Sequence, residues 1–291
     1  MRTLAALTAA AVCFALSATA FAQGVPNFYT ARAVSLGGAR SLATGVDSIF
    51  LNPAALGISQ QYLLQADYAH DTAPNPELTT GDGVVVSIVD AATNPRFPTG
   101  VSYRYVSLKV NGQLQRGSVY DFALAAQLFQ NMYLGLHLSY LSFTNGSLNV
   151  QNITGDFGLL IPVGPFTFSG TAFNLLTVQS PDAPRGGDVG IAVTDNQMYR
   201  VGFDYSRLWP INRFPENVYS AGGEVVFYNM VPVRAGVLWN SHDPKGWPPE
   251  YVTAGLGFYF QMIGVDASYR RNLLNGEGSW AFSVKLLGGG Q

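Results

Sequence analysis

The chain has 291 residues, of which 48% are hydrophobic and only 12% are charged, and its formal net charge is −2. Its 16 basic and 18 acidic residues form no basic block, which excludes a nucleic-acid partner. The chain is rich in Tyr, Phe and Gly, yet it has no second apolar run of about 20 residues after the N-terminus. This excludes a membrane-spanning helix in the mature chain.

The first 22 residues have the pattern of an export signal. A long apolar run follows Arg2, and the AFA sequence that ends at Ala22 has the small-x-small pattern that signal peptidase recognises. We therefore expect cleavage near Ala22. The only cysteine, Cys13, lies in the segment to be removed, so the mature chain would have no thiol. Such a chain is either a soluble β-sandwich or an outer-membrane β-barrel.

Apolar alternation favours the barrel. In MYLGLHLSY, residues 132–140, every second residue is large and apolar, and VTAGLGFYF (252–260) and WAFSVKL (280–286) follow the same rule. These runs match the length of about 9–11 residues that a tilted strand needs to cross a bilayer. The fold class we expect is all-β, a transmembrane antiparallel β-barrel.

Reading the whole chain in this way predicts fourteen strands. They cover 61–69, 83–90, 99–110, 118–129, 131–143, 152–161, 164–175, 187–194, 197–207, 217–228, 230–240, 250–260, 262–271 and 279–287.

The connections alternate between tight turns and longer polar links. Tight turns are expected near Gln130, Pro162, Asp195, Asn229 and Gln261, and longer links follow the odd-numbered strands, as in HDTAPNPELTTGD. An outer-membrane barrel has short periplasmic turns and longer external loops. The link AATNPRFP, after the second strand, is longer than this topology predicts.

Charged residues fall on the less apolar side of the predicted strands, which would face the lumen because charge on the lipid side is costly. Two interpretations stay open: these residues pair with one another to hold the interior together, or they select a solute. The predicted lumen-lining residues are Asp67, Arg104, Asp121, His137, Asp156, Arg200, Asp204, Glu224, Arg234, Asp266, Arg270 and Lys285.

The segment ahead of the first strand has signals of compact structure. In LATGVDSIFLNPAAL, residues 42–56, Asn52 is suited to be a helix N-cap and Pro53 the first helical residue. Gly37 and Gly38 permit tight backbone turns upstream. We therefore divide the chain into a signal peptide (1–22), an irregular N-terminal unit (23–60) and a barrel (61–291).

The stretch ARAVSLGGARSLATGVDSIFLNPAAL, Ala31 to Leu56, resembles the N-terminal signature of the FadL/TodX-like outer-membrane transport proteins, and is nearest to their PorV/PorQ branch. The resemblance implies a fourteen-stranded barrel whose N-terminal segment enters the lumen as a plug, or hatch. Whether its Asn-Pro-Ala motif gates the barrel or only caps a short helix stays open. The plug residues it implies are Gly37, Gly38, Asp47, Asn52, Pro53 and Ala54.

The function we expect is passive passage of small hydrophobic compounds through the outer membrane of a Gram-negative bacterium, in contact with outer-membrane lipid. The alternative is a secretion-associated or structural barrel of the PorV/PorQ type that docks a secretion-system protein. Neither function calls for a cofactor.

An enzymatic interpretation is weaker. The spacing of His137 and Ser139 resembles the His-x-Ser pair of the outer-membrane phospholipase, but here the pair shares the charged face, and no Asn can be assigned to orient it. His70, His137 and His242 fall in separate elements, so no metal site is expected. We expect no enzyme.

The hairpin turning near Asn229 has an unusual composition. With the turn centred there, Val226 is opposite Pro232, and four residues that weaken a strand ladder lie in two neighbouring strands. The cluster predicts either a lateral gate to the bilayer or an ordinary bulge that fits the barrel's curvature. Its members are Gly222, Gly223, Pro232 and Gly236.

Overall fold

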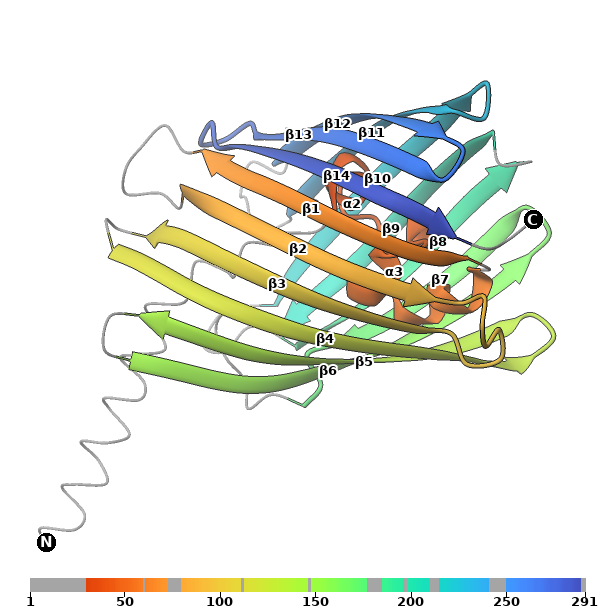
Figure 1. Cartoon of the computed structure of the whole chain (residues 1–291), viewed down its shortest axis with the longest axis horizontal. Helices are drawn as coiled ribbons and strands as arrows, with labels where there is room; N and C mark the ends of the chain where they lie inside the picture. The colour runs from red at the N-terminus through yellow and green to blue at the C-terminus, as the bar shows by residue number, and fades with distance from the viewer. Residues whose placement is uncertain are drawn as a thin grey trace, which may run out of the picture.

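The computed structural model describes residues 30–59, 61–72, 80–110, 113–145, 148–176, 185–195, 198–209, 215–240 and 250–288. Within these ranges, fourteen strands form a closed barrel in which each strand pairs antiparallel with its neighbours in the chain and β14 pairs with β1 (Figure 1). The predicted β-barrel is therefore confirmed, and the alternative prediction of a soluble β-sandwich is wrong. The strands are β1 (Tyr62–Thr72), β2 (Thr80–Asp90), β3 (Thr99–Val110), β4 (Gln113–Phe129), β5 (Met132–Asn145), β6 (Leu148–Val163), β7 (Phe166–Phe173), β8 (Arg185–Asp195), β9 (Tyr199–Trp209), β10 (Glu216–Phe227), β11 (Val231–Asn240), β12 (Tyr251–Phe260), β13 (Ile263–Asn272) and β14 (Gly278–Gly288).

Each predicted strand overlaps an observed one, but one predicted turn was misplaced. Pro162 lies inside β6, opposite Thr167 of β7, and the chain turns two residues later. The turn consists of Gly164 and Pro165, and Gly164 has a φ of +60°, a conformation that proline cannot adopt. The turn near Asn229 is correct, since Tyr228 and Asn229 both have positive φ.

The outward face of the barrel is apolar. Strand residues alternate between buried and exposed, and large hydrophobic side chains make up much of the exposed set, among them Val84, Phe122, Leu136, Phe258 and Leu286. An apolar surface that runs around the barrel in this way is unusual for a protein surrounded by water.

Within the described ranges, no helix combines the length and the apolar character needed to cross a membrane.

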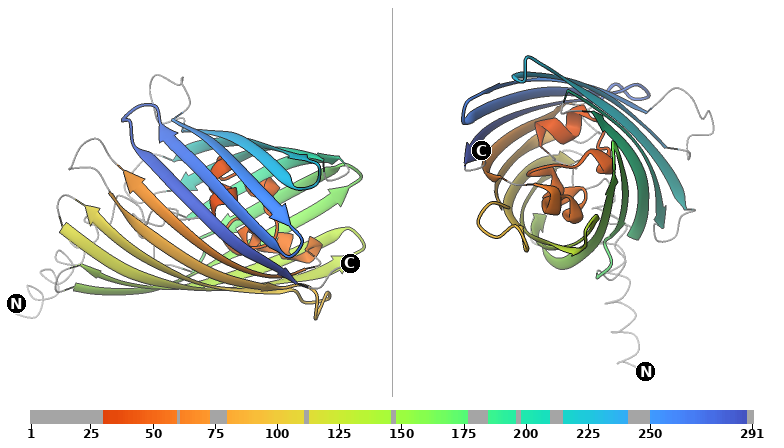
Figure 2. Two further views of the ribbon diagram at one scale, coloured as in Figure 1. Left: turned by 45° about the horizontal axis from the view of Figure 1, so that its top comes forward. Right: turned by 90° about the vertical axis from the view of Figure 1, so that its right-hand side faces the viewer.

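Residues 30–59 form four short helical segments that lie inside the ring of strands (Figure 2). We call this segment the plug. Asn52 caps its last helix as predicted, because its side chain accepts a hydrogen bond from the Ala54 nitrogen at 3.1 Å, and Pro53 begins the helix. The helices are α2 (Ala31–Ser35), η2 (Arg40–Leu42), α3 (Asp47–Phe50) and η3 (Pro53–Ile58).

The core of the protein lies between the plug and the wall of strands. Ile49 and Leu56 of the plug pack with Val85 and Val89 of β2 in one buried apolar cluster. A second cluster joins Leu36, Ala39 and Leu42 of the plug to Ala192 of β8. The plug and the wall therefore both contribute buried apolar side chains to the barrel interior.

Candidate functional site

Hydrogen bonds between distant parts of the chain tie the plug to the wall. The Ala31 nitrogen donates to Asp67 Oδ1 at 3.3 Å and to Ser283 Oγ at 3.2 Å. The Ser41 nitrogen and hydroxyl donate to Asp204 at 2.9 and 2.8 Å. Asp67 and Asp204, both predicted lumen residues, therefore hold the plug at two separate places.

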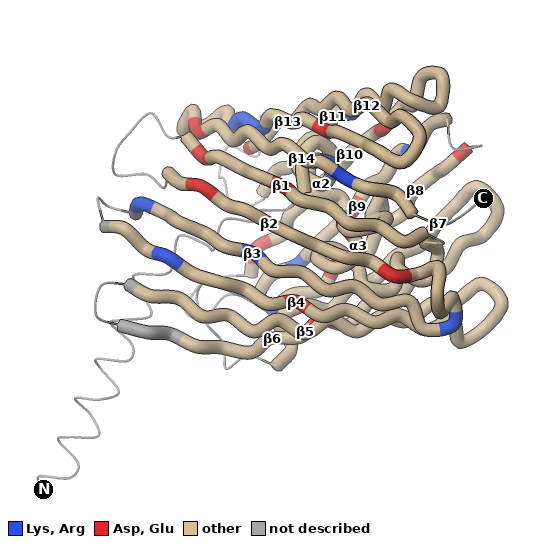
Figure 3. Tube along the Cα trace, in the orientation of Figure 1, with Lys and Arg blue, Asp and Glu red and all other residues tan. Residues whose placement is uncertain are grey.

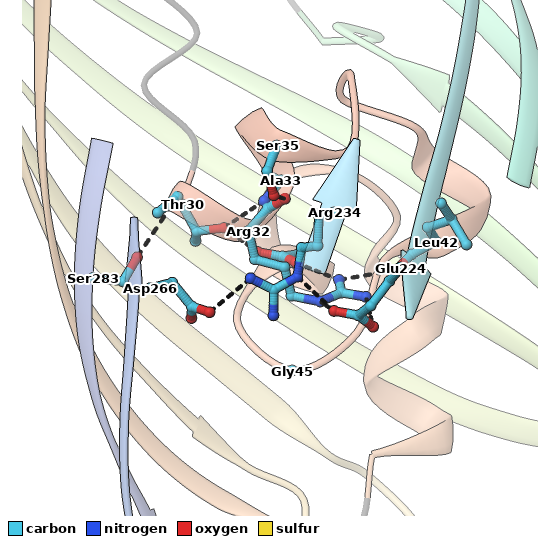
Figure 4. Close-up of polar contacts among 12 residues, drawn as sticks. Thr30, Arg32, Ala33, Ser35, Leu42, Gly45, Glu224, Arg234, Asp266 and Ser283 are labelled. Carbon is cyan, nitrogen blue, oxygen red and sulfur yellow. Dashed lines mark hydrogen bonds and ion pairs between the residues drawn. The ribbon is translucent and has the colours of Figure 1, made fainter. Parts of the chain in front are cut away.

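Arg32 is the centre of the ionic contact between plug and wall (Figure 4). Its side chain, only 9% exposed, reaches Asp47 of the plug at 2.7 Å and Glu224 of β10 at 3.2 Å. It also donates to the Leu42 carbonyl at 3.1 Å. Burial lowers the pKa of Arg32, but the carboxylates of Glu224 and Asp47 raise it well above its usual value. The guanidinium therefore stays charged inside the barrel.

The ionic contact continues into the wall. Arg234 donates to Glu224 at 2.5 Å and to Asp266 at 2.6 Å, and Lys285 pairs with Asp266 at 2.7 Å. The Tyr259 hydroxyl accepts from both Arg234 and Lys285. The predicted lumen charges of β10, β11, β13 and β14 therefore form one network with Arg32, whose role the sequence analysis missed.

A second charge network lies on β3 to β6. Arg104 donates twice to Asp121 at 2.8 Å, and His137 lies between Asp121 (3.1 Å) and Asp156 (2.8 Å). Ser139 is 3.1 Å from His137 but donates to Asp121 at 2.5 Å. Only a protonated imidazole donates to two carboxylates at once, so His137 is not a free base for Ser139. The arrangement therefore favours a structural role, in which these charged residues pair along the barrel wall, over a role for Ser139 as a nucleophile.

The remaining predicted lumen residues are less tightly paired. Arg270 is 3.6 Å from Asp71 and lies over the Tyr251 ring. Arg200 is half-buried and lies directly opposite Glu224 in the ladder between β9 and β10. Lys, Arg, Asp and Glu are spread thinly over many strands rather than gathered in one patch (Figure 3). His242 lies outside the described residues.

The Asn-Pro-Ala motif packs against bare backbone of β5 and β6. A Cβ atom on Gly135 would lie 2.2 Å from the Ala54 nitrogen, and one on Gly158 would lie 2.3 Å from Asn52 Oδ1. Asn52 also donates to the Leu159 carbonyl at 3.2 Å. The motif therefore both caps η3 and docks it on the wall.

The sequence analysis did not identify a set of glycines in the barrel wall that leave room for the plug. At each of them, an added Cβ would lie closer than 3 Å to a plug atom, so only glycine leaves enough room. The signal was available, because each of these glycines falls on the lumen side of a predicted strand. They are Gly100, Gly135, Gly158, Gly202, Gly222, Gly236 and Gly255.

We expect Gly135→Ala and Gly158→Ala each to loosen the docking of η3 by about 1–3 kcal/mol, the usual cost of overpacking. Gly170→Ala is the matched control, since its Cβ would meet no atom closer than 3.8 Å. Hydrogen exchange read by mass spectrometry should show faster exchange in residues 47–58 of the first two variants, with the strands still protected. Equal exchange in all three variants would contradict this docking.

Two residues of the predicted lateral gate are glycines for a different structural reason, which is contact with the plug. Gly222 and Gly236 are direct partners in the ladder between β10 and β11, as predicted, and both face the plug at Leu36 and Gly37. β10 pairs along its length with both neighbours. The short ladder is instead between β11 and β12, where pairing runs only from Val233 to Leu238.

A cavity of about 450 Å³ lies between the plug and the wall. Its apolar lining includes Phe50, Leu141, Phe173, Leu208 and Leu238. Its polar lining includes Arg40, Arg104, His137, Asp156 and Arg270. A cavity of this size and mixed lining fits a small, mainly apolar molecule.

Comparison with known proteins finds the same fold in hydrocarbon channels. No protein-family model and no curated protein matches the chain. The Pseudomonas putida toluene transporter TodX superposes with a TM-score of 0.64 at 13% identity, over 89% of this chain and 97% of that one.

Two further solved structures agree with this comparison. The CymD monoaromatic hydrocarbon channel gives a TM-score of 0.69 at 16% identity, over 90% of this chain and 97% of that one. The Ralstonia pickettii toluene transporter TbuX gives 0.67 at 12% identity, over 91% and 98%. The chain is therefore similar in fold to these channels, as a closed fourteen-stranded barrel with a short N-terminal helical segment.

Proposed function

We propose that the protein is an outer-membrane channel for passive passage of small hydrophobic compounds. The observation that carries the proposal is the partly apolar cavity between plug and wall, inside a closed barrel whose outward face is apolar. That outward face would contact outer-membrane lipid. The fold shared with channels for toluene and monoaromatic hydrocarbons supports the same class of compound.

Uptake by cells tests this function. The chain would be expressed in a Gram-negative strain that lacks channels of this fold, and entry of a labelled monoaromatic hydrocarbon would be compared with entry of a labelled sugar. We expect hydrocarbon uptake to rise several-fold over the empty vector while sugar uptake stays unchanged. Equal hydrocarbon uptake, or a rise for both solutes, would contradict the proposal.

The docking function implied by the PorV/PorQ resemblance makes the opposite prediction for the same cells. A docking barrel would leave hydrocarbon uptake unchanged, and a secretion-system protein would copurify with it from its native membrane.

We also propose that a compound leaves the cavity sideways through the seam between β11 and β12. Val231 and Pro232 lie beyond the described pairing on β11, and the Pro232 ring is packed against Gly257 of β12. Proline cannot donate to the ladder, so the regular register with β12 begins at Val233. Beyond Pro232 the seam is held by a backbone hydrogen bond, from the Tyr259 nitrogen to the Met230 carbonyl at 2.7 Å. Of the predicted gate residues, Pro232 lies at the short seam, whereas Gly222 and Gly236 make room for Leu36 and Gly37 of the plug. A bulge that only adjusts curvature is the competing explanation.

Locking this seam should slow uptake. Val233 and Leu256 are direct partners across it and both point outward, so a Val233→Cys, Leu256→Cys pair can form a disulfide there. We expect oxidation to reduce hydrocarbon uptake several-fold and a reductant to restore it. Val265→Cys with Val284→Cys is the control, an outward pair on the long seam between β13 and β14. Full uptake by the oxidised β11–β12 variant would exclude the sideways exit.

A further inference from the structure

Strands β7, β8 and β9 carry a group of buried polar residues that belongs to neither charge network. Asp188 of β8 is opposite Thr171 on one side and Ser206 on the other. Asp204 of β9 and Ser169 of β7 are both opposite Gly190 of β8, so they lie on its two sides. None of Ser169, Thr171, Asp188 and Asp204 is more than 7% exposed. We call these four residues the β7–β9 cluster.

The cluster holds more oxygen atoms than hydrogen-bond donors. Asp204 accepts from the Ser41 nitrogen and hydroxyl, and Asp188 Oδ2 accepts from Ser206 at 2.6 Å. Asp188 Oδ1, Ser169 Oγ and Thr171 Oγ1 are buried and have no hydrogen-bond partner among the described residues. Buried polar atoms are rarely left in this way unless a water or an ion completes them.

The polar residues of the cluster lie in two adjacent rows of the sheet, Thr171, Asp188 and Ser206 in one and Ser169, Gly190 and Asp204 in the next. A Cβ on Gly190 would lie 1.9 Å from Asp204 Oδ1 and 2.8 Å from Ser169 Oγ, so these two oxygens share the space that glycine leaves open. Asp188 and Asp204 are diagonal neighbours on β8 and β9, because Asp188 is opposite Ser206 and Gly190 is opposite Asp204. The cluster therefore gathers carboxylate and hydroxyl oxygens from three adjacent strands.

Two adjacent buried carboxylates repel each other unless a positive charge or a shared proton lies between them. Arg40 is the plug cation nearby, but its guanidinium donates to the Leu51 carbonyl at 2.6 Å and lies over the Phe173 ring at 4.4 Å. A shared proton would satisfy the carboxyl pair alone. It would leave Ser169 Oγ and Thr171 Oγ1 without partners, whereas a cation would take these oxygens as ligands as well.

We propose that the β7–β9 cluster binds a hard cation through oxygen ligands, and that this cation is Ca²⁺. Ca²⁺ takes six to eight oxygen ligands in flexible geometry, roughly at 2.3–2.6 Å, whereas Mg²⁺ demands an octahedron and keeps several waters. Asp188 and Asp204 supply charge, Ser169 and Thr171 supply hydroxyl oxygens, and water completes the shell. Among the described residues, no group of three or more His, Cys, Asp or Glu side chains is placed to hold a metal ion, so a site here depends on the hydroxyl and water oxygens beside the two carboxylates.

The position of the cluster gives the ion a structural consequence. Asp204 is also the acceptor that fixes Ser41 of η2 to the wall. An ion that keeps Asp204 charged and in place strengthens this attachment, so calcium would hold one side of the plug closed. Binding itself does not depend on which compound the channel passes, and its test is separate from the test of transport.

Equilibrium dialysis with ⁴⁵Ca²⁺ on the purified full-length protein in detergent, first stripped with a chelator, tests the site. We expect one Ca²⁺ per chain in the wild type and affinity weaker by at least about tenfold in Asp188→Asn, which removes a charged ligand. Ser169→Ala with Thr171→Ala keeps the charge and should weaken binding less. Asp82→Asn is the control, an exposed carboxylate that contacts His70 and Tyr68 on the outer face.

Before binding is measured, each variant is checked for folding by comparing its migration on SDS gels with and without heating. The proposal is overturned if the folded wild type binds no Ca²⁺ at millimolar concentration, the result expected of a shared proton. It is also overturned if Asp188→Asn binds as tightly as Asp82→Asn, or if equimolar Na⁺ displaces the bound ⁴⁵Ca²⁺.

Discussion

Deleting residues 30–57 is expected to convert the closed barrel into an open, water-filled pore. The plug supplies many of the buried side chains of the interior, including Leu36, Ile49 and Leu56, none of which is more than 1% exposed. The strands pair with one another around the whole circumference without using plug residues. The barrel should therefore still fold, and planar-bilayer recordings should show steady ion conductance where the intact protein shows little.

A control variant with a linker of equal length distinguishes loss of the plug from misfolding caused by a shortened chain. Replacing the deleted residues with a flexible Gly-Ser linker of equal length should leave the pore equally open, because its composition cannot fill the lumen. The plug assignment fails if the deleted protein does not insert, or if it conducts no better than the intact chain. Either result would mean that the wall depends on residues 30–57 or is already sealed without them.

The strands could be predicted from the sequence because their information is local. Alternation along each strand indicates which side faces the apolar surroundings, and a tight turn fixes the register of its hairpin. This is why Val226 was correctly placed opposite Pro232. The error at Pro162 has a local cause as well: proline was taken as a turn residue, but Gly164 has the positive φ that the turn requires.

The docking of the plug could not be predicted in the same way, since its contacts join residues far apart in the chain. Ala31 binds Ser283, and Arg32 binds Glu224. A lone arginine in an apolar segment and a glutamate in a strand give no sign of their partnership. The proximity of Asp188 to Asp204 was missed for a related reason: the two residues lie on neighbouring strands, and no pattern within β8 reveals it.

The glycines illustrate how a correct register can support an incomplete explanation. Gly222 and Gly236 were selected because glycine weakens a strand ladder, and they do lie opposite each other. Their ladder is nevertheless continuous, and the atoms that exclude a side chain belong to Leu36 and Gly37 of the plug. Sequence alone does not distinguish a glycine that weakens a strand from one that makes room for another segment.

Replacing Arg32 should open the plug more than any other single substitution. Arg32→Gln leaves Asp47 without its guanidinium partner and removes one of the two arginines that neutralise Glu224. Breaking a buried ion pair from one side costs about 3–5 kcal/mol. At 1.4 kcal/mol per factor of ten, the undocked fraction of the plug should rise by at least about two orders of magnitude. Planar-bilayer recordings should show frequent openings where the wild type is quiet.

Two further variants identify the ion pair as the cause. Arg32→Gln combined with Glu224→Gln should conduct less than Arg32→Gln alone, because replacing both partners leaves fewer unpaired charges in the lumen. Arg116→Gln should behave as the wild type, since Arg116 is exposed on β4 and away from the plug. If Arg32→Gln is as quiet as Arg116→Gln, the apolar contacts alone hold the plug. If the double variant opens as often as Arg32→Gln, the lost contact to Glu224 is not what releases it.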